Sequence, residues 1–449
     1  MSPTDRPTRP LAALLLGLVV LACTGKAPPT TTPTGGASAV PSSGTAAATP
    51  HAVSVILPST DAWLAVGRAG GDGLEIVLGS TGEHLFNLPS GVPDGTWSQL
   101  VTVAAKAKTT VVRALDVPEL GGASQVIDGA WRLPTLGADP TPVGVSGDGQ
   151  TIVLVADGAK AASGAAASSR FAILHRSLSG KPRFVTLQGS FEYDALSPDG
   201  AILYVVEHLP APPVGHYQVR SIDTATGILR DGVVVDKTGL DEAMAGYPIA
   251  QARQPYGMVF TLYRGREHPF IHALNTVDAW ALCIDLPATG ADDATAALDW
   301  GLAATADGHT LVAANATLGL AAEIPLGDLA VRRSVTFAPA ASTAITLAKF
   351  GHEAGGPVDR RVVVSPLGST LYAAGRGGIV RLGMTDLAVT GRFLEGIAVD
   401  AVAVTRDGGT LYALVHAGGR IMKLDATTGK VEGTVPGGGF DRLVAVVPG

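Results

Sequence analysis

Eight polar or aromatic residues stand in two loop-like segments, 207–217 and 263–270, and their chemistry suits recognition of a partner. They are Glu207, His208, His216, Tyr217, Arg264, Arg266, Glu267 and His268. Together they offer both signs of charge and both hydrogen-bond donors and acceptors. We therefore predict that they form a binding surface. The alternative is that the segments are insertions that have drifted, because lengthening a surface loop costs little free energy.

A second group consists of four aspartates, each just before an apolar run such as "AVAVTRDGG". They are Asp299, Asp359, Asp400 and Asp441. If these runs line a channel, the carboxylates could bind a cation at its mouth. Calcium requires several convergent oxygen ligands, and the chain has no D-x-D-x-D loop to supply them. The simpler interpretation is that each aspartate accepts hydrogen bonds from backbone donors at a strand start. The four are weak metal candidates, and we expect no metal or other cofactor.

The usual catalytic motifs are absent from the sequence. There is no H-E-x-x-H, and "GVSGD" at 144–148 departs from G-x-S-x-G at its last position. In "EHPFIH", at 267–272, His268 and His272 would be well separated on a strand, so they would not share a metal ion. No glycine-rich loop opens a helix to hold a nucleotide. The sequence thus names no catalytic residue.

The elements that must position the candidate residues follow a repeat. "LSPDGAILYVVE", at 196–207, recurs as "VSGDGQTIVLVAD" at 145, "ATADGHTLVAANA" at 304, "VSPLGSTLYAAGR" at 364 and "VTRDGGTLYALVH" at 404. Proline, aspartate and glycine between apolar runs predict a tight turn joining antiparallel strands. The last copy extends to four strands, which we name A to D: 401–405, 410–415, 420–424 and 430–435.

Units of this kind begin near residues 98, 143, 193, 247, 301, 361 and 401, with one more before Trp63. Four strands every 40 to 61 residues predict an all-β fold, a β-propeller of seven or eight four-stranded blades in a single ring. The tail "FDRLVAVVPG", at 440–449, has the pattern of an A strand with nothing after it. We expect it to pair with the N-terminal strands and close the ring, leaving no exposed sheet edge.

The repeat "VTRDGGTLYALVHAGGRIMKLDATTGKVEGTV" resembles the YVTN-type β-propeller repeat, a WD40-like module. The resemblance covers nearly all of 51–449 and implies a fold, with no specific activity attached. In such a ring the A–B and C–D turns leave one face, and the B–C and D–A loops leave the other. The long segments 157–170, 207–217, 236–247 and 263–270 would share the second face, where binding residues are commonly found.

The N-terminus predicts where the protein acts. Arg6 and Arg9 precede an apolar run at 11–22 that is too short to span a bilayer, so 1–22 has the pattern of a secretory signal. "VLAC" resembles a bacterial lipobox, which implies lipidation of Cys23 and an extracytoplasmic protein anchored to the cell membrane. The alternative is plain secretion, with Cys23 lost in the signal. Residues 24–50, rich in Thr, Pro and Ser, predict a disordered tether that follows Cys23, leaving 51–449 for the propeller.

Composition limits the partners. The net charge is −7 and no basic stripe is present, so nucleic acid is not an expected ligand. We expect a monomer that binds a protein, peptide or glycan of the envelope without catalysis. The alternative is a propeller hydrolase of the lactonase kind. It would require Asp299, Asp359, Asp400, His352 and Glu353 to converge at the channel mouth.

Overall fold

The computed structural model describes residues 61–68, 71, 73–136, 139–156, 168–209, 217–237, 246–254, 256–265, 268–287, 296–339 and 360–447. They belong to one compact unit, Leu57–Gly449. The predicted signal, Cys23 and the tether lie outside the described residues, so these assignments stay predictions. In the described part of the chain, no helix is long and apolar enough to cross a membrane.

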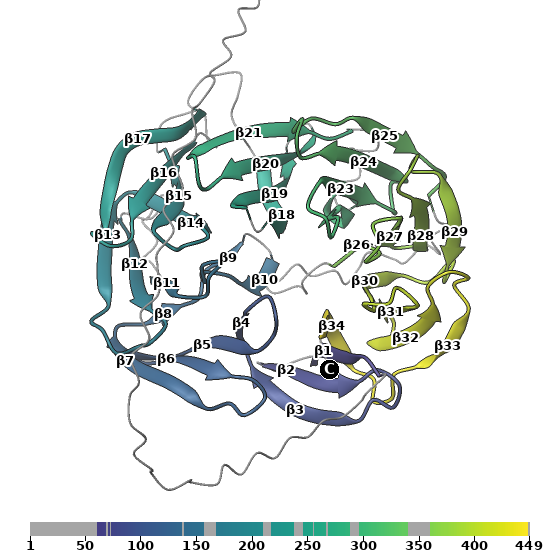
Figure 1. Ribbon diagram of the computed structural model, residues 1–449, viewed down its shortest axis with the longest axis horizontal. Coiled ribbons are helices and arrows are strands. Elements are labelled where there is room, and N and C mark those ends of the chain that lie inside the picture. The colour runs from purple at the N-terminus through teal and green to yellow at the C-terminus, as the bar shows by residue number, and fades with distance from the viewer. Residues whose placement is uncertain are drawn as a thin grey trace, which may run out of the picture. The chain divides into compact units, whose positions relative to one another are not determined.

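The described unit is a β-propeller of eight four-stranded antiparallel sheets arranged in a ring (Figure 1). Of the two blade counts expected, eight is therefore confirmed. From the channel outward, blades 1 to 4 contain β34 (Phe440–Val447), β1 (Trp63–Arg68), β2 (Gly73–Leu78) and β3 (His84–Pro89); β4 (Gly91–Pro93), β5 (Gln99–Lys106), β6 (Thr109–Asp116) and β7 (Gly122–Asp128); β8 (Trp131–Arg132), β11 (Thr151–Ala156), β12 (Ser168–His175) and β13 (Arg183–Gln188); and β14 (Ser190–Leu196), β15 (Ile202–His208), β16 (Tyr217–Asp223) and β17 (Ile228–Lys237).

Blades 5 to 8 follow the chain in order. They contain β18 (Gly246–Arg253), β19 (Met258–Gly265), β20 (Pro269–Asn275) and β21 (Trp280–Asp285); β22 (Gly301–Ala304), β23 (Thr310–Asn315), β24 (Leu320–Pro325) and β25 (Arg333–Thr336); β26 (Val362–Val364), β27 (Thr370–Gly375), β28 (Gly378–Gly383) and β29 (Val389–Phe393); and β30 (Val399–Val404), β31 (Thr410–Val415), β32 (Arg420–Asp425) and β33 (Val431–Thr434). A short 3-10 helix, η1 (Ala296–Asp299), precedes blade 6.

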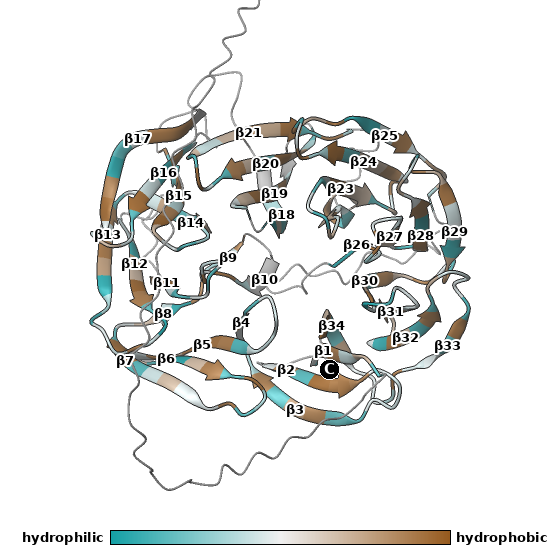
Figure 2. Ribbon diagram, viewed as in Figure 1, coloured by the Kyte–Doolittle hydropathy of each residue, from teal (hydrophilic) through white to brown (hydrophobic). Residues whose placement is uncertain are grey.

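A separate apolar core lies between each blade and the next, so the ring contains eight cores. Between blades 4 and 5, for example, Tyr204 and Val219 pack against Val259 and Leu274. The middle strands of the blades carry the most apolar segments, as Figure 2 shows. A four-stranded sheet has two faces to bury, and a closed ring covers both with neighbouring blades.

The C-terminal strand closes the ring, as the sequence predicts. β34 takes the innermost position of blade 1 and pairs antiparallel with β1, from Trp63↔Val447 to Arg68↔Phe440. Leu443 is fully buried in the core that joins blades 8 and 1. Both ends of the described chain therefore share one sheet.

The repeated turn has the chemistry that its residues predict. In blade 4, Ser197 Oγ donates to Asp199 Oδ1 at 2.6 Å, and the Ala201 amide donates to the same oxygen at 3.1 Å. Gly200 adopts φ +67°, which a glycine accepts without strain. Asp148, Asp307 and Asp407 make the same pair of hydrogen bonds in blades 3, 6 and 8. The recurring motif is thus a self-contained hydrogen-bonded turn.

In blades 2 and 3 the innermost strand does not lie where the sequence analysis expected it. Blade 2 begins at β4, before the predicted start near residue 98, where the structure has the second strand, β5. In blade 3 the inner position is split: β8 pairs with the end of β11, and Val145 bridges to Ile152 near its start. Between them the chain forms the hairpin β9 (Thr135–Leu136) and β10 (Asp139–Pro142), which contacts β14 and β18 of the next two blades.

Candidate functional site

The second-to-third and fourth-to-first strand connections leave one face of the ring, which we call the long-loop face. The chain leaves β11 at Ala156 and returns at Ser168, and it leaves β17 at Lys237 and returns at Gly246. The β15–β16 connection, after His208, belongs to the same face. On this face, connections of at least eight residues thus join strands within blade 3 and within blade 4 and lead from blade 4 to blade 5.

The predicted binding residues divide into those inside and those outside the described part of the chain. His216, Arg266 and Glu267 lie outside it, and for Arg264 only the backbone, at the end of β19, is described. Glu207 and His208 end β15, Tyr217 begins β16, and His268 directly precedes β20. The structure thus brings Glu207, His208, Tyr217 and His268 to one end of two neighbouring blades.

Glu207 is held by an arginine that the sequence did not single out. Arg220 Nη1 donates to Glu207 Oε2 at 2.9 Å, and Arg220 Nη2 donates to the Arg230 carbonyl at 3.1 Å. Both charged side chains are mostly buried. The pair links β15, β16 and β17, so Glu207 stabilises the blade beneath the face.

Two exposed acid–histidine pairs lie on the face itself. His208 Nε2 lies 3.2 Å from Glu192 Oε2, and His268 Nε2 lies 2.9 Å from Asp285 Oδ1. The contact with His208 lowers the pKa of Glu192. Glu192 and Asp285 are 70% and 71% exposed, so a partner can reach both carboxylates.

Tyr217 differs from the expectation of an exposed contact residue. Its side chain is 3% exposed and packs in the core between blades 4 and 5. Burial raises the pKa of its hydroxyl far above the ordinary value. Tyr217 therefore supports the face from below.

A buried polar group lies beneath the same end of blades 4 and 5. Asp194 Oδ2 of β14 lies 3.8 Å from His272 Nε2 of β20, and both side chains are only 2% exposed. Tyr263 lies edge-on to His272, with ring centroids 6.4 Å apart. Burial raises the pKa of Asp194 and of Tyr263. His272 lies on a strand, as the sequence analysis expected, and the structure shows that it is buried. Its carboxylate neighbour comes from another blade and has no sequence signal.

The aspartates before the inner strands have partners of their own. Asp299 Oδ2 accepts hydrogen bonds from Arg376 Nε and Thr317 Oγ1, both at 2.8 Å. Asp400 Oδ2 lies 2.9 Å from His416 Nδ1, and Asp441 Oδ1 accepts from Arg442 at 3.3 Å. Asp359 lies outside the described residues. Within the described ranges no group of three or more His, Cys, Asp or Glu side chains could hold a metal ion.

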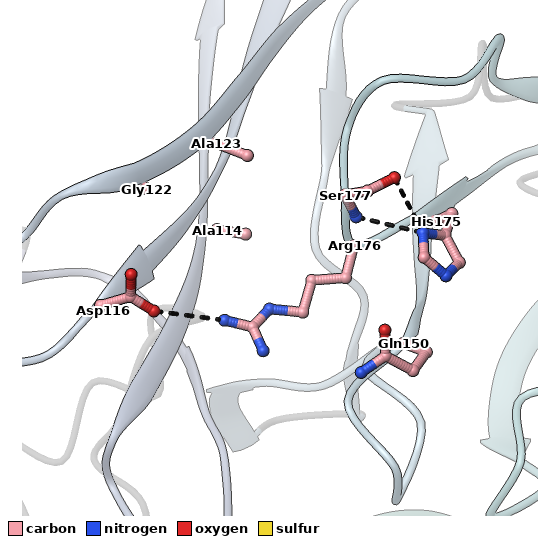
Figure 3. A pocket seen from close by; sticks show the side chains of 8 residues that line it. All are labelled: Ala114, Asp116, Gly122, Ala123, Gln150, His175, Arg176 and Ser177. Atoms are coloured by element: carbon pink, nitrogen blue, oxygen red, sulfur yellow. Dashed lines mark hydrogen bonds and ion pairs between the residues drawn. The ribbon is translucent and has the colours of Figure 1, made fainter. Parts of the chain in front are cut away.

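The opposite face, formed by the short first-to-second and third-to-fourth strand turns, carries a shallow pocket of about 280 Å³. It lies between blades 2 and 3 (Figure 3). Small residues line the blade 2 side, and polar residues line the blade 3 side; the full lining is Ala114, Asp116, Gly122, Ala123, Gln150, His175, Arg176 and Ser177. No sequence pattern indicates this pocket, because its lining comes from several separate segments.

Comparisons with known proteins extend to the fold. No protein-family model matches the chain, and no curated protein matches it. Among solved structures, apo AztD from Citrobacter koseri aligns over 86% of this chain and 98% of its own, at 12% identity and a TM-score of 0.51. The dihydro-heme d1 dehydrogenase NirN, in complex with DHE, aligns over 86% of this chain and 75% of its own, at 15% identity and a TM-score of 0.50. At these identities the likeness shows the fold alone: the chain is similar to these β-propellers, and the YVTN-type resemblance stays a prediction.

Proposed function

We propose that this chain is a non-catalytic propeller, anchored outside the cytoplasmic membrane through Cys23, that binds an envelope protein through its long-loop face. The observation that carries the proposal is the pair of exposed acid–histidine contacts on blades 4 and 5, Glu192–His208 and Asp285–His268. They lie at the end of blades 4 and 5 from which the β15–β16 and β17–β18 connections leave the sheets. A rigid ring that presents charged groups beside long loops suits recognition of another surface.

A protein or peptide partner fits the described residues of this face better than a glycan. Sugar binding typically uses an exposed aromatic ring on which the sugar stacks. Here Tyr217 and Phe270 are buried, and Tyr263 stacks on Phe270 with ring centroids 5.1 Å apart. The exposed groups are charged instead, and charged groups at the rim of an interface chiefly set specificity and association rate.

The lactonase-like alternative lacks support in the described part of the chain. Asp299 is already bound by Arg376, and Asp400 by His416. His352, Glu353 and Asp359 lie outside the described residues.

The proposal is tested by crosslinking in the membrane, followed by affinity capture of the intact chain. The test variant carries His208→Ala and His268→Ala, which removes one member of each exposed pair. The matched control carries His309→Ala, an exposed histidine at a turn of the opposite face. The proposal predicts a protein captured by the wild type and the control and lost from the double variant. Equal capture by all three chains would show that the partner does not bind through the long-loop face. Capture of a glycan alone would show that the partner is not a protein.

A further inference from the structure

The pocket on the short-turn face contains an arginine whose hydrogen-bonding capacity is largely unused. The Arg176 side chain is only 16% exposed. Its Nη2 lies 3.8 Å from Asp116 Oδ1, which is longer than a hydrogen bond. Within the described residues, this guanidinium has no hydrogen bond to another side chain or to a carbonyl group. The group crosses the pocket between the two blades, as Figure 3 shows.

A backbone hydrogen bond fixes the position of the main chain at Arg176. The Arg176 amide donates to the Gln150 carbonyl at 2.7 Å, which ties the β12–β13 turn to the start of β11. The side chain then extends from blade 3 towards Asp116 at the end of β6 in blade 2. The side chain is only 16% exposed and lies beside Asp116, so it has fewer conformations to lose when a ligand binds, which lowers the entropic cost of binding.

The neighbouring groups on blade 3 add further polar contacts. The Ser177 amide donates to His175 Nδ1 at 3.1 Å, so the hydrogen of the neutral imidazole belongs on Nε2, which can donate. The side chains of Gln150 and Ser177 also line the pocket. On the blade 2 side, Ala114 and Ala123 leave space where larger residues would fill it.

We infer that this pocket binds the carboxylate of a small monoanionic ligand, with Arg176 as its main partner. The planar guanidinium matches a carboxylate through two parallel hydrogen bonds. The nearby Asp116 carboxylate repels anions, and it would disfavour a dianion such as phosphate more strongly than a monoanion. The volume of about 280 Å³ suits a small acid or one acidic side chain. The site lies on the face opposite to the proposed partner surface and is independent of it.

The two sources of such a carboxylate, a free acid or an acidic peptide, are separated by the choice of probe. Propionate and a blocked tripeptide, acetyl-Gly-Glu-Gly-amide, are each titrated into the full-length chain at constant ionic strength. Binding is followed by saturation-transfer NMR, with the Gln-containing tripeptide as the neutral control. Binding of propionate identifies the carboxylate group as sufficient, and binding of the peptide alone identifies an acidic segment. Either result supports the site.

Three variants test whether Arg176 carries the binding. Arg176→Gln should weaken it at least tenfold, while Arg183→Gln, which removes an exposed arginine of the same blade, should leave it unchanged. Asp116→Asn should strengthen it several-fold, because the competing anion is gone. Thermal melting confirms that each variant is folded. Absence of binding by both probes, binding that survives Arg176→Gln, or an equal loss in Arg183→Gln would each overturn the inference.

Discussion

Leu64 of β1 lies directly opposite Val446 of β34, so the first and last strands of the described chain belong to one sheet. Leu443 of β34 is fully buried, between blades 8 and 1. Leu443→Ala should lower the free energy of unfolding by about 2 to 5 kcal/mol, the usual cost of such a truncation in a core. Urea denaturation measures this. Val444→Ala, on the partly exposed side of the same strand, is the control, and an equal loss in both variants would contradict a closure that depends on the buried core.

The turn of blade 7 tests whether the aspartate of the repeated turn stabilises the fold, because this blade lacks it. There Leu367 stands where four other blades have aspartate, and its side chain is 89% exposed. Leu367→Asp should accept hydrogen bonds from Ser365 and from the backbone after the turn, as Asp199 does in blade 4. The expected gain is about 0.5 to 1.5 kcal/mol in the free energy of unfolding. Thermal or urea unfolding would detect it, and a loss of stability would mean that Leu367 makes a stabilising contact instead.

Asp194 predicts a pH dependence of stability with a definite sign. Burial raises the pKa of this carboxyl in the folded protein, so folding favours its protonated form. Asp194 contributes fully to stability below the pKa of about 3.9 that an aspartate has in the unfolded chain. This contribution is lost as the pH rises through the pKa of Asp194 in the folded protein. Asp194→Asn should therefore gain stability relative to the wild type as the pH increases. Urea unfolding at pH 4 to 7 checks this, and a difference that stays constant with pH would contradict the raised pKa.

The Asp400–His416 contact predicts a pH dependence of the same sign, but in a range that begins near the unfolded pKa of histidine. The hydrogen bond with Asp400 raises the pKa of His416 above its ordinary value. The stability from this pair is full below the unfolded histidine pKa of about 6.5 and is lost as the pH rises through the folded pKa. Asp400→Asn should lower the pKa of His416, which NMR of the imidazole protons measures directly. An unchanged titration would show that the two side chains are not paired in solution.

The N-terminal prediction can be tested separately from the fold. If Cys23 is lipidated, the wild-type chain should appear in the membrane fraction, while Cys23→Ser should be released or remain as an unprocessed precursor. Cys283→Ser, at the other cysteine of the chain, is the matched control. Membrane localisation of the Cys23→Ser chain equal to that of wild type would contradict the anchor.

The fold could be predicted because its information is local. Turns such as 197–200 are held by hydrogen bonds between their own residues. Each copy of the motif can therefore be recognised from a few consecutive residues. The inner strands of blades 2 and 3 were misplaced because they do not carry the motif. β4 has three residues, and the A strand of blade 3 is interrupted by the β9–β10 hairpin.

The candidate site could be predicted only in outline. The sequence indicated which segments share a face, and so it named His208 and His268. Their partners Glu192 and Asp285, and the arginine that binds Glu207, come from other strands, and pairing register decides which residues meet. Tyr217 was expected on the surface, but the core between blades 4 and 5 buries it.

Site-specific photocrosslinking in living cells shows which face of the ring contacts a partner. A photoreactive amino acid is placed at position 268 on the long-loop face or, in a second chain, at position 309 on the short-turn face. We expect a discrete adduct with an envelope protein from position 268 and none from position 309. An adduct from position 309 alone, or none from either position, would contradict binding through the long-loop face.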